Sequence, residues 1–458
     1  MTEPGNRQRR SRELIRREAL LTGLILLFSY APNSRAQTVT ISWNKADQVI
    51  DGFGASDANE AAPLSSAQAA LFFSPSSGVG LSLLRTEVPD DGSCSTVNAT
   101  CAGEVSDMRL AIANGARVWS TPWSPPPSMK SNGSVNNGGS LLADYYGAYA
   151  RYLANYVKSL SSLDGINLYA LSVQNEPEKS TYYASAVWSA ANFDTFIRSN
   201  LAPTFAQDGL TTLIAMPETA IYNDLDQYAS LTMSDPAAAP YVGIYATHDY
   251  SLIDKSVQPL SPTVGKHLWE TEVSDMNPFD GSMTSALRYA QYINDWMTIA
   301  NANAWHYWLL IGRENDNQGL IDHSGSVSKR LYAMGNYSKF VRPGFYRIDA
   351  TETPESGVSV SAYKNSTNGA LVIVVINQNS LVVPQSFALD GATTSSVTPW
   401  ITDGSRSLVQ QAAVSVTGNS FTYSLPAFSI TTFVGTTTTA SVPTSVAPPT
   451  QLSATVSN

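Results

Sequence analysis

Two glutamates in short polar motifs carry the chemistry that this sequence encodes most clearly. Glu176 stands in Gln174-Asn175-Glu176-Pro177, and Glu272 stands in Trp269-Glu270-Thr271-Glu272-Val273. Each follows an apolar run that is typical of a β-strand. Two facing carboxyl groups can break a glycosidic bond, because one protonates the leaving oxygen while the other attacks or stabilises the anomeric carbon. The two motifs therefore predict a glycosidase, provided that the fold brings both glutamates into one cleft.

The two glutamates are 96 residues apart, so the fold must bring distant strand ends together. Between residues 50 and 342 short apolar runs alternate with amphipathic segments. Eight strands are expected at 52–56, 81–88, 117–121, 166–174, 212–218, 242–248, 267–271 and 302–310, with helices such as 143–159, 185–197 and 285–299. No Gly-rich phosphate turn follows the first strand. Eight such alternations favour a (β/α)8 TIM barrel over an open sheet, and in a barrel the C-terminal strand ends meet at one face.

Residues 343–436 have a different character. Apolar and polar residues alternate at 358–363, 370–376, 385–389, 397–401, 413–416 and 421–425, with Gly, Asn and Ser at the breaks. This pattern predicts a small antiparallel β-sandwich, and residues 37–49, which alternate in the same way, could add a strand to it. Residues 437–458 are rich in Thr, Ser and Pro and read as a linker, whose last stretch resembles the start of a fibronectin type III module.

The first 36 residues are expected to be a signal peptide. An arginine-rich head precedes an apolar run at 19–31, and Ser34-Arg35-Ala36 offers a cleavage site before Gln37. Thirteen apolar or small residues are too few to span a bilayer, although an uncleaved membrane anchor is the alternative. We therefore expect a secreted protein with no membrane association after cleavage.

Charge and cysteine usage narrow the class of partner. Residues 1–36 carry seven basic and three acidic residues, so the rest of a chain with net charge −10 carries about −14. An acidic surface disfavours nucleic acid and anionic membrane as partners, but it is compatible with a neutral polysaccharide. Cys94 and Cys101 are the only cysteines, and an exported chain would join them in one local disulfide; two free thiols are the alternative. The four histidines form no ligand cluster in the sequence, so we expect no metal and no cofactor.

Six motifs in the same order resemble those of glycoside hydrolase family 30. They are Asp51-Gly52-Phe53-Gly54-Ala55-Ser56, Thr121-Pro122-Trp123-Ser124-Pro125-Pro126, the two glutamate motifs, Tyr337-Ser338-Lys339-Phe340-Val341-Arg342-Pro343-Gly344 and Leu425-Pro426-Ala427-Phe428-Ser429-Ile430-Thr431-Thr432-Phe433. The likeness covers about residues 40–436. It implies a barrel with a fused β-sandwich and a retaining mechanism, with Glu176 as acid/base and Glu272 as nucleophile. An acid with a raised pKa and an ionised nucleophile are the expected tuning.

Other residues are weaker candidates. By the resemblance, Arg85 would brace the nucleophile, with an ion pair to Glu87 or Glu218 as the alternative. Asn175 could donate to the sugar 2-hydroxyl, and His248 and Tyr250 could bond the nucleophile or the substrate, or be satisfied core residues. Trp123 and Trp308 could stack on sugar rings. Glu270 is unexpected where an apolar or small residue would be usual; it could pair with Arg85 inside the barrel or line the site.

The favoured function is a secreted endo-β-1,4-xylanase that acts as a monomer on plant polysaccharide. A β-1,6-glucanase, a glucosylceramidase-type β-glucosidase and a non-catalytic carbohydrate-binding protein are the alternatives. Glucuronoxylan-specific relatives carry an arginine near the position of Arg313, where it clamps the uronic acid. Because Glu314 and Asp316 flank Arg313 here, we expect action on plain or arabinose-decorated xylan rather than a requirement for uronic acid.

Overall fold

The computed structural model describes residues 37–58, 63–101, 103–250 and 265–437. The expected signal peptide, and all of the expected linker except Thr437, lie outside these ranges. Within the ranges, no helix combines the length and the apolar character needed to cross a membrane.

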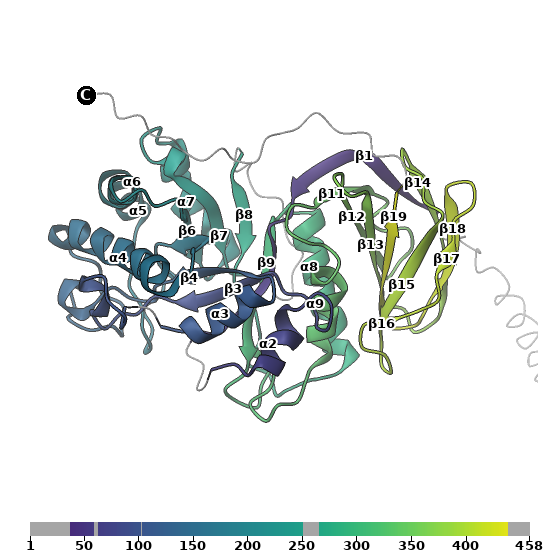
Figure 1. Ribbon diagram of the computed structural model, residues 1–458, viewed down its shortest axis with the longest axis horizontal. Coiled ribbons are helices and arrows are strands. Elements are labelled where there is room, and N and C mark those ends of the chain that lie inside the picture. The colour runs from purple at the N-terminus through teal and green to yellow at the C-terminus, as the bar shows by residue number, and fades with distance from the viewer. Residues whose placement is uncertain (1–36, 59–62, 102, 251–264, 438–458) are drawn as a thin grey trace, which may run out of the picture. The chain divides into compact units, whose positions relative to one another are not determined.

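Eight parallel strands close into a barrel (Figure 1). They are β2 (Gly52–Ser56), β3 (Leu83–Glu87), β4 (Arg117–Thr121), β5 (Ala170–Ser172), β6 (Leu213–Thr219), β7 (Val242–Thr247), β8 (His267–Glu270) and β9 (Ala304–Ile311). Each strand pairs with the next, β9 pairs with both β2 and β8, and the short strand β10 (Gly319–Ile321) adds to β9 outside the ring. The predicted barrel is confirmed, and its C-terminal strand ends form a single face.

Helices cover the outside of the barrel. They are α2 (Ser66–Phe73), α3 (Val105–Ala113), α4 (Tyr146–Asp164), α5 (Ala190–Phe196), α6 (Ala202–Gln207), α7 (Leu225–Ser234), α8 (Met283–Thr298) and α9 (Lys329–Ser338). The helix expected at 185–197 begins only at Ala190, because Ser189 caps it in a reciprocal pair of bonds with Asn192. The loop that precedes it, and that follows Glu176, is therefore longer than the sequence pattern suggests.

The second sheet is mostly antiparallel and forms the sandwich. Its strands are β1 (Val39–Val49), β11 (Tyr346–Ala350), β12 (Val358–Asn365), β13 (Ala370–Asn377), β14 (Val383–Asp390), β15 (Ser396–Thr402), β16 (Val409–Gln410), β17 (Val414–Ser415), β18 (Ser420–Leu425) and β19 (Ser429–Thr436). Strand β1 lies between β11, to which it is antiparallel, and β14, to which it is parallel. The N-terminal strand thus belongs to the same sheet as the C-terminal strands.

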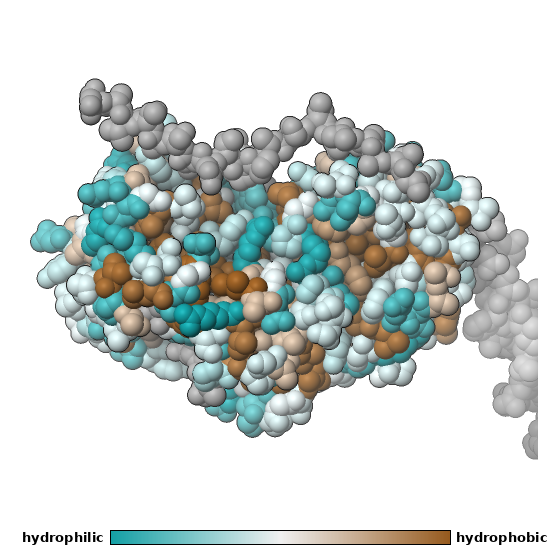
Figure 2. All heavy atoms as spheres, viewed as in Figure 1, coloured by the Kyte–Doolittle hydropathy of each residue, from teal (hydrophilic) through white to brown (hydrophobic). Residues whose placement is uncertain are grey.

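Apolar side chains are buried in three clusters. One fills the space between the barrel and its helices, one is the sandwich core, and the smallest fills the barrel with Trp119, Trp269 and small residues such as Ala170 and Ala304. On the face shown in Figure 2, polar side chains divide the remaining apolar ones into separate patches. The barrel interior is therefore a packed core, and the chemistry must lie at its rim.

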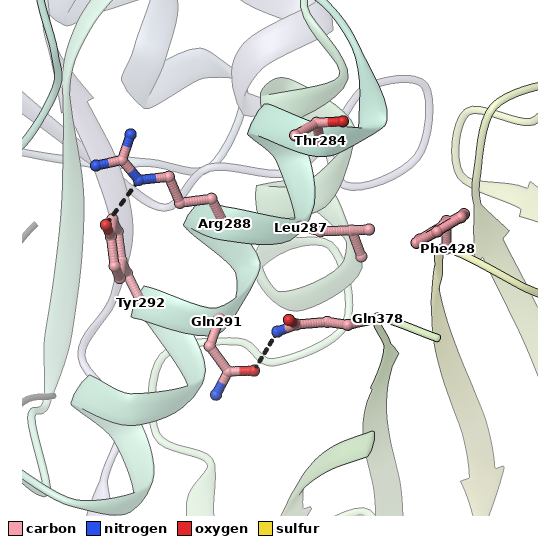
Figure 3. Close-up of a pocket in the computed structure, with 7 residues that line it drawn as sticks. All are labelled: Thr284, Leu287, Arg288, Gln291, Tyr292, Gln378 and Phe428. Atoms are coloured by element: carbon pink, nitrogen blue, oxygen red, sulfur yellow. Dashed lines mark hydrogen bonds between the residues drawn. The ribbon is translucent and has the colours of Figure 1, made fainter. Parts of the chain in front are cut away.

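Two adjoining cavities, of about 370 and 610 Å³, lie along α8. In the smaller one, Gln378 donates to Gln291 of α8 at 2.9 Å, and Phe428 lies on the far side (Figure 3). Neither cavity is lined by Glu176 or Glu272. Both cavities therefore lie between α8 and the sandwich, and neither contains the two glutamates.

Cys94 and Cys101 form the expected disulfide, with their Cα atoms 4.5 Å apart. The bridge closes a short loop after β3, and Asn155 of α4 donates to the carbonyl of Cys94 at 3.0 Å. The disulfide therefore fixes a loop against the barrel wall.

Candidate active site

The barrel brings the two glutamates together. Glu176 follows β5 and Glu272 follows β8, and both are nearly buried, with 8% and 5% of their surface exposed. A carboxylate oxygen of each and a ring nitrogen of His248 lie within 4.8 Å of one another. A separation of about 5 Å is the spacing of retaining glycosidases, since inverting enzymes hold their carboxyls roughly 6.5–9.5 Å apart to admit a water.

Arg85 of β3 is the central cation of the site and is fully buried. Its Nη1 donates to Glu272 Oε2 at 2.5 Å, and its Nη2 donates to Asn175 Oδ1 at 2.6 Å and pairs with Glu218 Oε1 at 2.8 Å. The structure therefore combines the two sequence interpretations of Arg85, because one guanidinium contacts Glu272 and is also ion-paired with Glu218. Such charge-assisted bonds hold the Glu272 carboxylate in one orientation.

His248, directly after β7, lies among three carboxylates. Its ring nitrogens are 3.5 Å from Glu176, 3.6 Å from Glu218 and 3.7 Å from Glu272. Burial by itself would lower its pKa, but these negative charges outweigh burial and raise the pKa of His248 to about 10. The imidazole is therefore a cation at neutral pH.

Two tyrosines complete the hydrogen bonding of the pair. Tyr250 donates to Glu272 Oε1 at 2.8 Å, and Tyr183 donates to Glu176 Oε2 at 3.0 Å. Glu272 thus accepts from a guanidinium and a phenol, whereas Glu176 accepts from one phenol and lies against His248. This difference gives the two carboxyls different environments, which is the condition for separate acid and nucleophile roles.

The two carboxyls titrate as a pair because each charge disfavours the other. Burial acts to raise the pKa of Glu176, but His248 and Tyr183 outweigh it and lower that pKa. Burial raises the pKa of Glu272 despite His248 and Arg85, and the charge on Glu176 raises it further. Without substrate, the two shifts therefore run opposite to the tuning expected from the sequence, in which the acid has the raised pKa and the nucleophile stays ionised.

The backbone at Glu176 is unusual for a residue with a side chain. Its φ is +44°, in the left-handed region, and its amide donates to the carbonyl of Glu218 at 3.0 Å. Such conformations cost free energy and cluster at functional sites. The preceding Asn175 is held by Arg85 and by a backbone bond from its amide to Pro122.

The predicted aromatic platforms lie at the same rim. Trp123 follows β4, Trp308 lies in β9, and their ring centroids are 6.0 Å apart. The Arg85 guanidinium lies 4.6 Å from the Trp123 ring centroid. Trp123 is only 5% exposed, so most of its ring is buried in contacts such as the one with Arg85.

Arg313 lies beyond the end of β9 and is exposed. Its Nη2 donates to the carbonyl of Ala58 at 2.9 Å. Asp316, which the sequence suggested could neutralise it, accepts instead from Gln318.

Glu270 takes neither of the two positions considered for it. It is fully buried, and its two carboxyl oxygens accept from the backbone amides of Glu272 and His306. It therefore lies beneath the nucleophile candidate rather than beside Arg85 or in the cleft.

Sequence reasoning did not assign Glu218 or Tyr183 to the site. Glu218 stands at the end of a barrel strand, and that same signal identified the other two glutamates. Tyr183 lies in the irregular loop before Ala190, where no periodicity marks it.

The grouping of Glu176, His248 and Glu272 also has a spacing that could suit a cation. A metal ligand must be a neutral imidazole. The three surrounding carboxylates favour the protonated form of His248, and a protonated imidazole does not bind a metal.

Comparison with known families agrees with this geometry. Residues 105–320 match the model of the glycosyl hydrolase family 30 TIM-barrel domain, and residues 344–433 match that of the family 30 beta sandwich domain. The glucuronoxylanase XynC of Bacillus subtilis (strain 168) is 34% identical over 411 residues, which cover 87% of this chain and 92% of that protein. The chain belongs to glycosyl hydrolase family 30.

The chain is also similar to proteins named for other activities. The family 30 subfamily 8 xylanase Xyn30A from Clostridium acetobutylicum superposes with a TM-score of 0.79 at 34% identity, covering 87% of this chain and 99% of that one. A putative glucosylceramidase 4 of Caenorhabditis elegans is 27% identical over 309 residues, 61% of this chain and 59% of that protein. This family 30 member is thus a glycoside hydrolase with the retaining mechanism of its family.

Proposed function

We propose that the protein is an endo-β-1,4-xylanase in which Glu176 is the acid/base and Glu272 is the nucleophile. The observation that carries the assignment of roles is the environment of Glu272. Arg85 and Tyr250 both donate to its carboxylate, and these two contacts act against burial by favouring the ionised form that attacks the anomeric carbon.

The two steps follow from this placement. Glu272 attacks the anomeric carbon while Glu176 gives its proton to the glycosidic oxygen, so the leaving chain departs as an alcohol and a glycosyl ester forms on Glu272. The Glu176 carboxylate then takes a proton from water, which attacks the same carbon and releases Glu272. A bound sugar would bury Glu176 further and oppose its charge, whereas Arg85 and Tyr250 keep donating to Glu272. We infer that substrate binding places the shared proton on Glu176.

The roles can be tested with azide and an aryl β-xyloside that has a good leaving group. In Glu272→Ala, azide takes the place of the missing carboxylate and should give the α-glycosyl azide, with inverted configuration. In Glu176→Ala, the glycosyl ester still forms and azide should release it as the β-glycosyl azide, with retained configuration. The reverse pattern would refute the assignment, and Glu218→Gln serves as the control for loss of a neighbouring carboxylate.

The choice of xylan rests on the extent of similarity. The xylanases resemble almost the whole chain at 34% identity, whereas the glucosylceramidase relative resembles 61% of it at 27%. Initial rates on xylan, β-1,6-glucan and an aryl β-glucoside provide the test, and faster turnover of either glucose substrate would refute the proposal. The lengths of the first xylan products distinguish internal cleavage from release of single sugars at a chain end.

We further propose that the enzyme does not require uronic acid side groups. Burial and the charges of Glu104 and Asp90 raise the pKa of Glu87 to about 8, and Arg313 acts to lower it. A uronate held by Arg313 would add a further negative charge near this group of three carboxyls. Equal rates on glucuronoxylan before and after enzymatic removal of the uronic acids are expected; a hundredfold drop, matched by Arg313→Ala, would contradict this.

A further inference from the structure

Glu270 occupies a gap in the hydrogen-bond ladder of the barrel. Strands β8 and β9 are paired through Trp269 and Ala304 alone, whereas β7 and β8 share four residue pairs. The ladder resumes where the amide of Trp308 donates to the carbonyl of Val273 at 3.0 Å. Between these points two buried backbone amides need an acceptor.

The side chain of Glu270 supplies both acceptors. Its Oε1 accepts from the amide of Glu272 at 3.0 Å, and its Oε2 accepts from the amide of His306 at 2.9 Å. An apolar side chain at this position would leave both amides buried without these bonds, at a cost of about 1–3 kcal/mol each. One carboxyl group therefore joins the end of β8 to β9 in place of backbone pairing.

The His306 ring strengthens the same connection. Its Nδ1 lies 2.8 Å from the carbonyl of Glu270, and Trp119 donates to its Nε2 at 3.1 Å. These partners assign a neutral ring with its proton on Nδ1, and burial lowers the pKa of His306 to about 3. Glu270 is thus held at its side chain and at its carbonyl, directly below the segment that carries Glu272.

We propose that Glu270 is a positioning residue that fixes the backbone of Glu272 so that its carboxylate meets the anomeric carbon. The inference rests on the proposed role of Glu272. A displacement of about 1 Å can reduce the rate about a hundredfold, because the reacting atoms must lie within about 3–3.5 Å. Arg85 and Tyr250 orient the carboxylate of Glu272, and Glu270 fixes the backbone of the same residue.

The barrel contains a matched control on the same pair of strands. The side chain of Asn303, just before β9, accepts from the amide of Leu268 in β8 at 2.8 Å. Like Glu270, it therefore connects the two strands through a side chain and a buried amide. It lies at the other end of β8, away from Glu272. Removing either side chain should lower stability, but only Glu270 should affect the attack by Glu272.

The test uses an activated 2-deoxy-2-fluoro-β-xylobioside, which labels the nucleophile in proportion to its rate of attack. For Glu270→Met we expect the inactivation rate constant to fall about ten- to a hundredfold, with little change in the half-saturating concentration. Glu270→Gln, which keeps one acceptor, should fall between this variant and the unaltered enzyme. Asn303→Leu should have a lower melting temperature, but its inactivation rate constant should stay within about twofold of that of the unaltered enzyme. This difference is well below the loss of at least about tenfold that we expect when Glu272 is no longer positioned.

The outcomes separate the two proposals. If both Glu270 variants have lower melting temperatures but are inactivated as fast as Asn303→Leu, then Glu270 is merely structural and the inference is wrong. If Glu270→Met does not fold, the labelling rate of Glu270→Gln decides in the same way. Peptide mapping of the labelled, unaltered enzyme identifies the nucleophile, and a label outside the peptide that contains Glu272 would overturn the proposed function and the positioning role with it.

Discussion

Replacing His248 with phenylalanine should shift the pH profile of catalysis to higher pH. His248 is charged at neutral pH because its pKa is raised to about 10. Its charge lowers the pKa of both Glu176 and Glu272. Phenylalanine keeps a flat ring beside Tyr250, whose ring centroid is 5.9 Å away, and removes the charge.

The distances set the size of the shift. The ring nitrogens of His248 lie 3.5 Å from Glu176 and 3.7 Å from Glu272. At an effective dielectric constant of about 20, two unit charges about 4 Å apart interact by about 4 kcal/mol, which is about three pKa units and an upper bound. Rearrangement of Arg85 and its partners should absorb most of this, so we expect a shift of about one unit.

The sign follows from the same interaction. Loss of a cation raises the pKa of a carboxyl group. The acid limb of kcat/KM reports ionisation of the nucleophile and the basic limb reports loss of the proton from the acid, so both limbs should move to higher pH.

The assay is kcat/KM on soluble xylan across the acidic and neutral range, with exposed His323→Phe as the control. A profile that stays in place would show that His248 carries no charge at the site. A shift to lower pH would show that its contact with the carboxyls is not electrostatic, and either result would refute the reasoning.

Three further outcomes are expected. Arg85→Met should lower the free energy of unfolding by about 3–5 kcal/mol, measured by denaturant titration, because it leaves buried carboxylates unpaired; a loss below about 1 kcal/mol, the range of surface ion pairs, would contradict the role of Arg85. Replacing Cys94 and Cys101 with serine should lower that free energy by about 2–3 kcal/mol with turnover unchanged, since the closed loop is short; altered kcat would instead connect the loop to the site. The protonated His248 should stabilise the fold fully below its ordinary pKa and lose this contribution as pH rises through about 10, so the melting temperature of the unaltered enzyme should fall more steeply there than that of His248→Phe.

Much of the fold follows from the sequence pattern. The strands expected at 52–56 and 117–121 coincide with β2 and β4, in which every residue except Arg117 is buried. The strand expected at 166–174 shrinks to Ala170–Ser172, and the amide of Ile166 at its expected start donates to Leu160 of α4 instead of to a strand. The length of a strand is therefore harder to predict than its position in the sequence, because the neighbouring strands decide where pairing ends.

The site was predictable where a strand end carries a charge and unpredictable where a loop contributes. Arg85, Glu176, His248 and Glu272 all stand at or just after barrel strands, so their convergence follows from the fold class. Tyr183 reaches Glu176 from a loop whose path depends on tertiary contacts. The role of Glu270 could not be deduced either, because the gap between β8 and β9 that it fills is a property of barrel closure and not of any local pattern.

Strand β1 has a consequence for the biogenesis of the chain. During synthesis it emerges before the barrel, yet its partners β11 and β14 are made only after the barrel is complete. Until then β1 is an unpaired strand, and pairings over so long a sequence separation form slowly. A ribosome that stalls anywhere in the barrel leaves this strand free to pair with another nascent chain. Successful production should therefore depend on the time that translation takes between β1 and β14, and on chaperones that bind exposed strands during that interval.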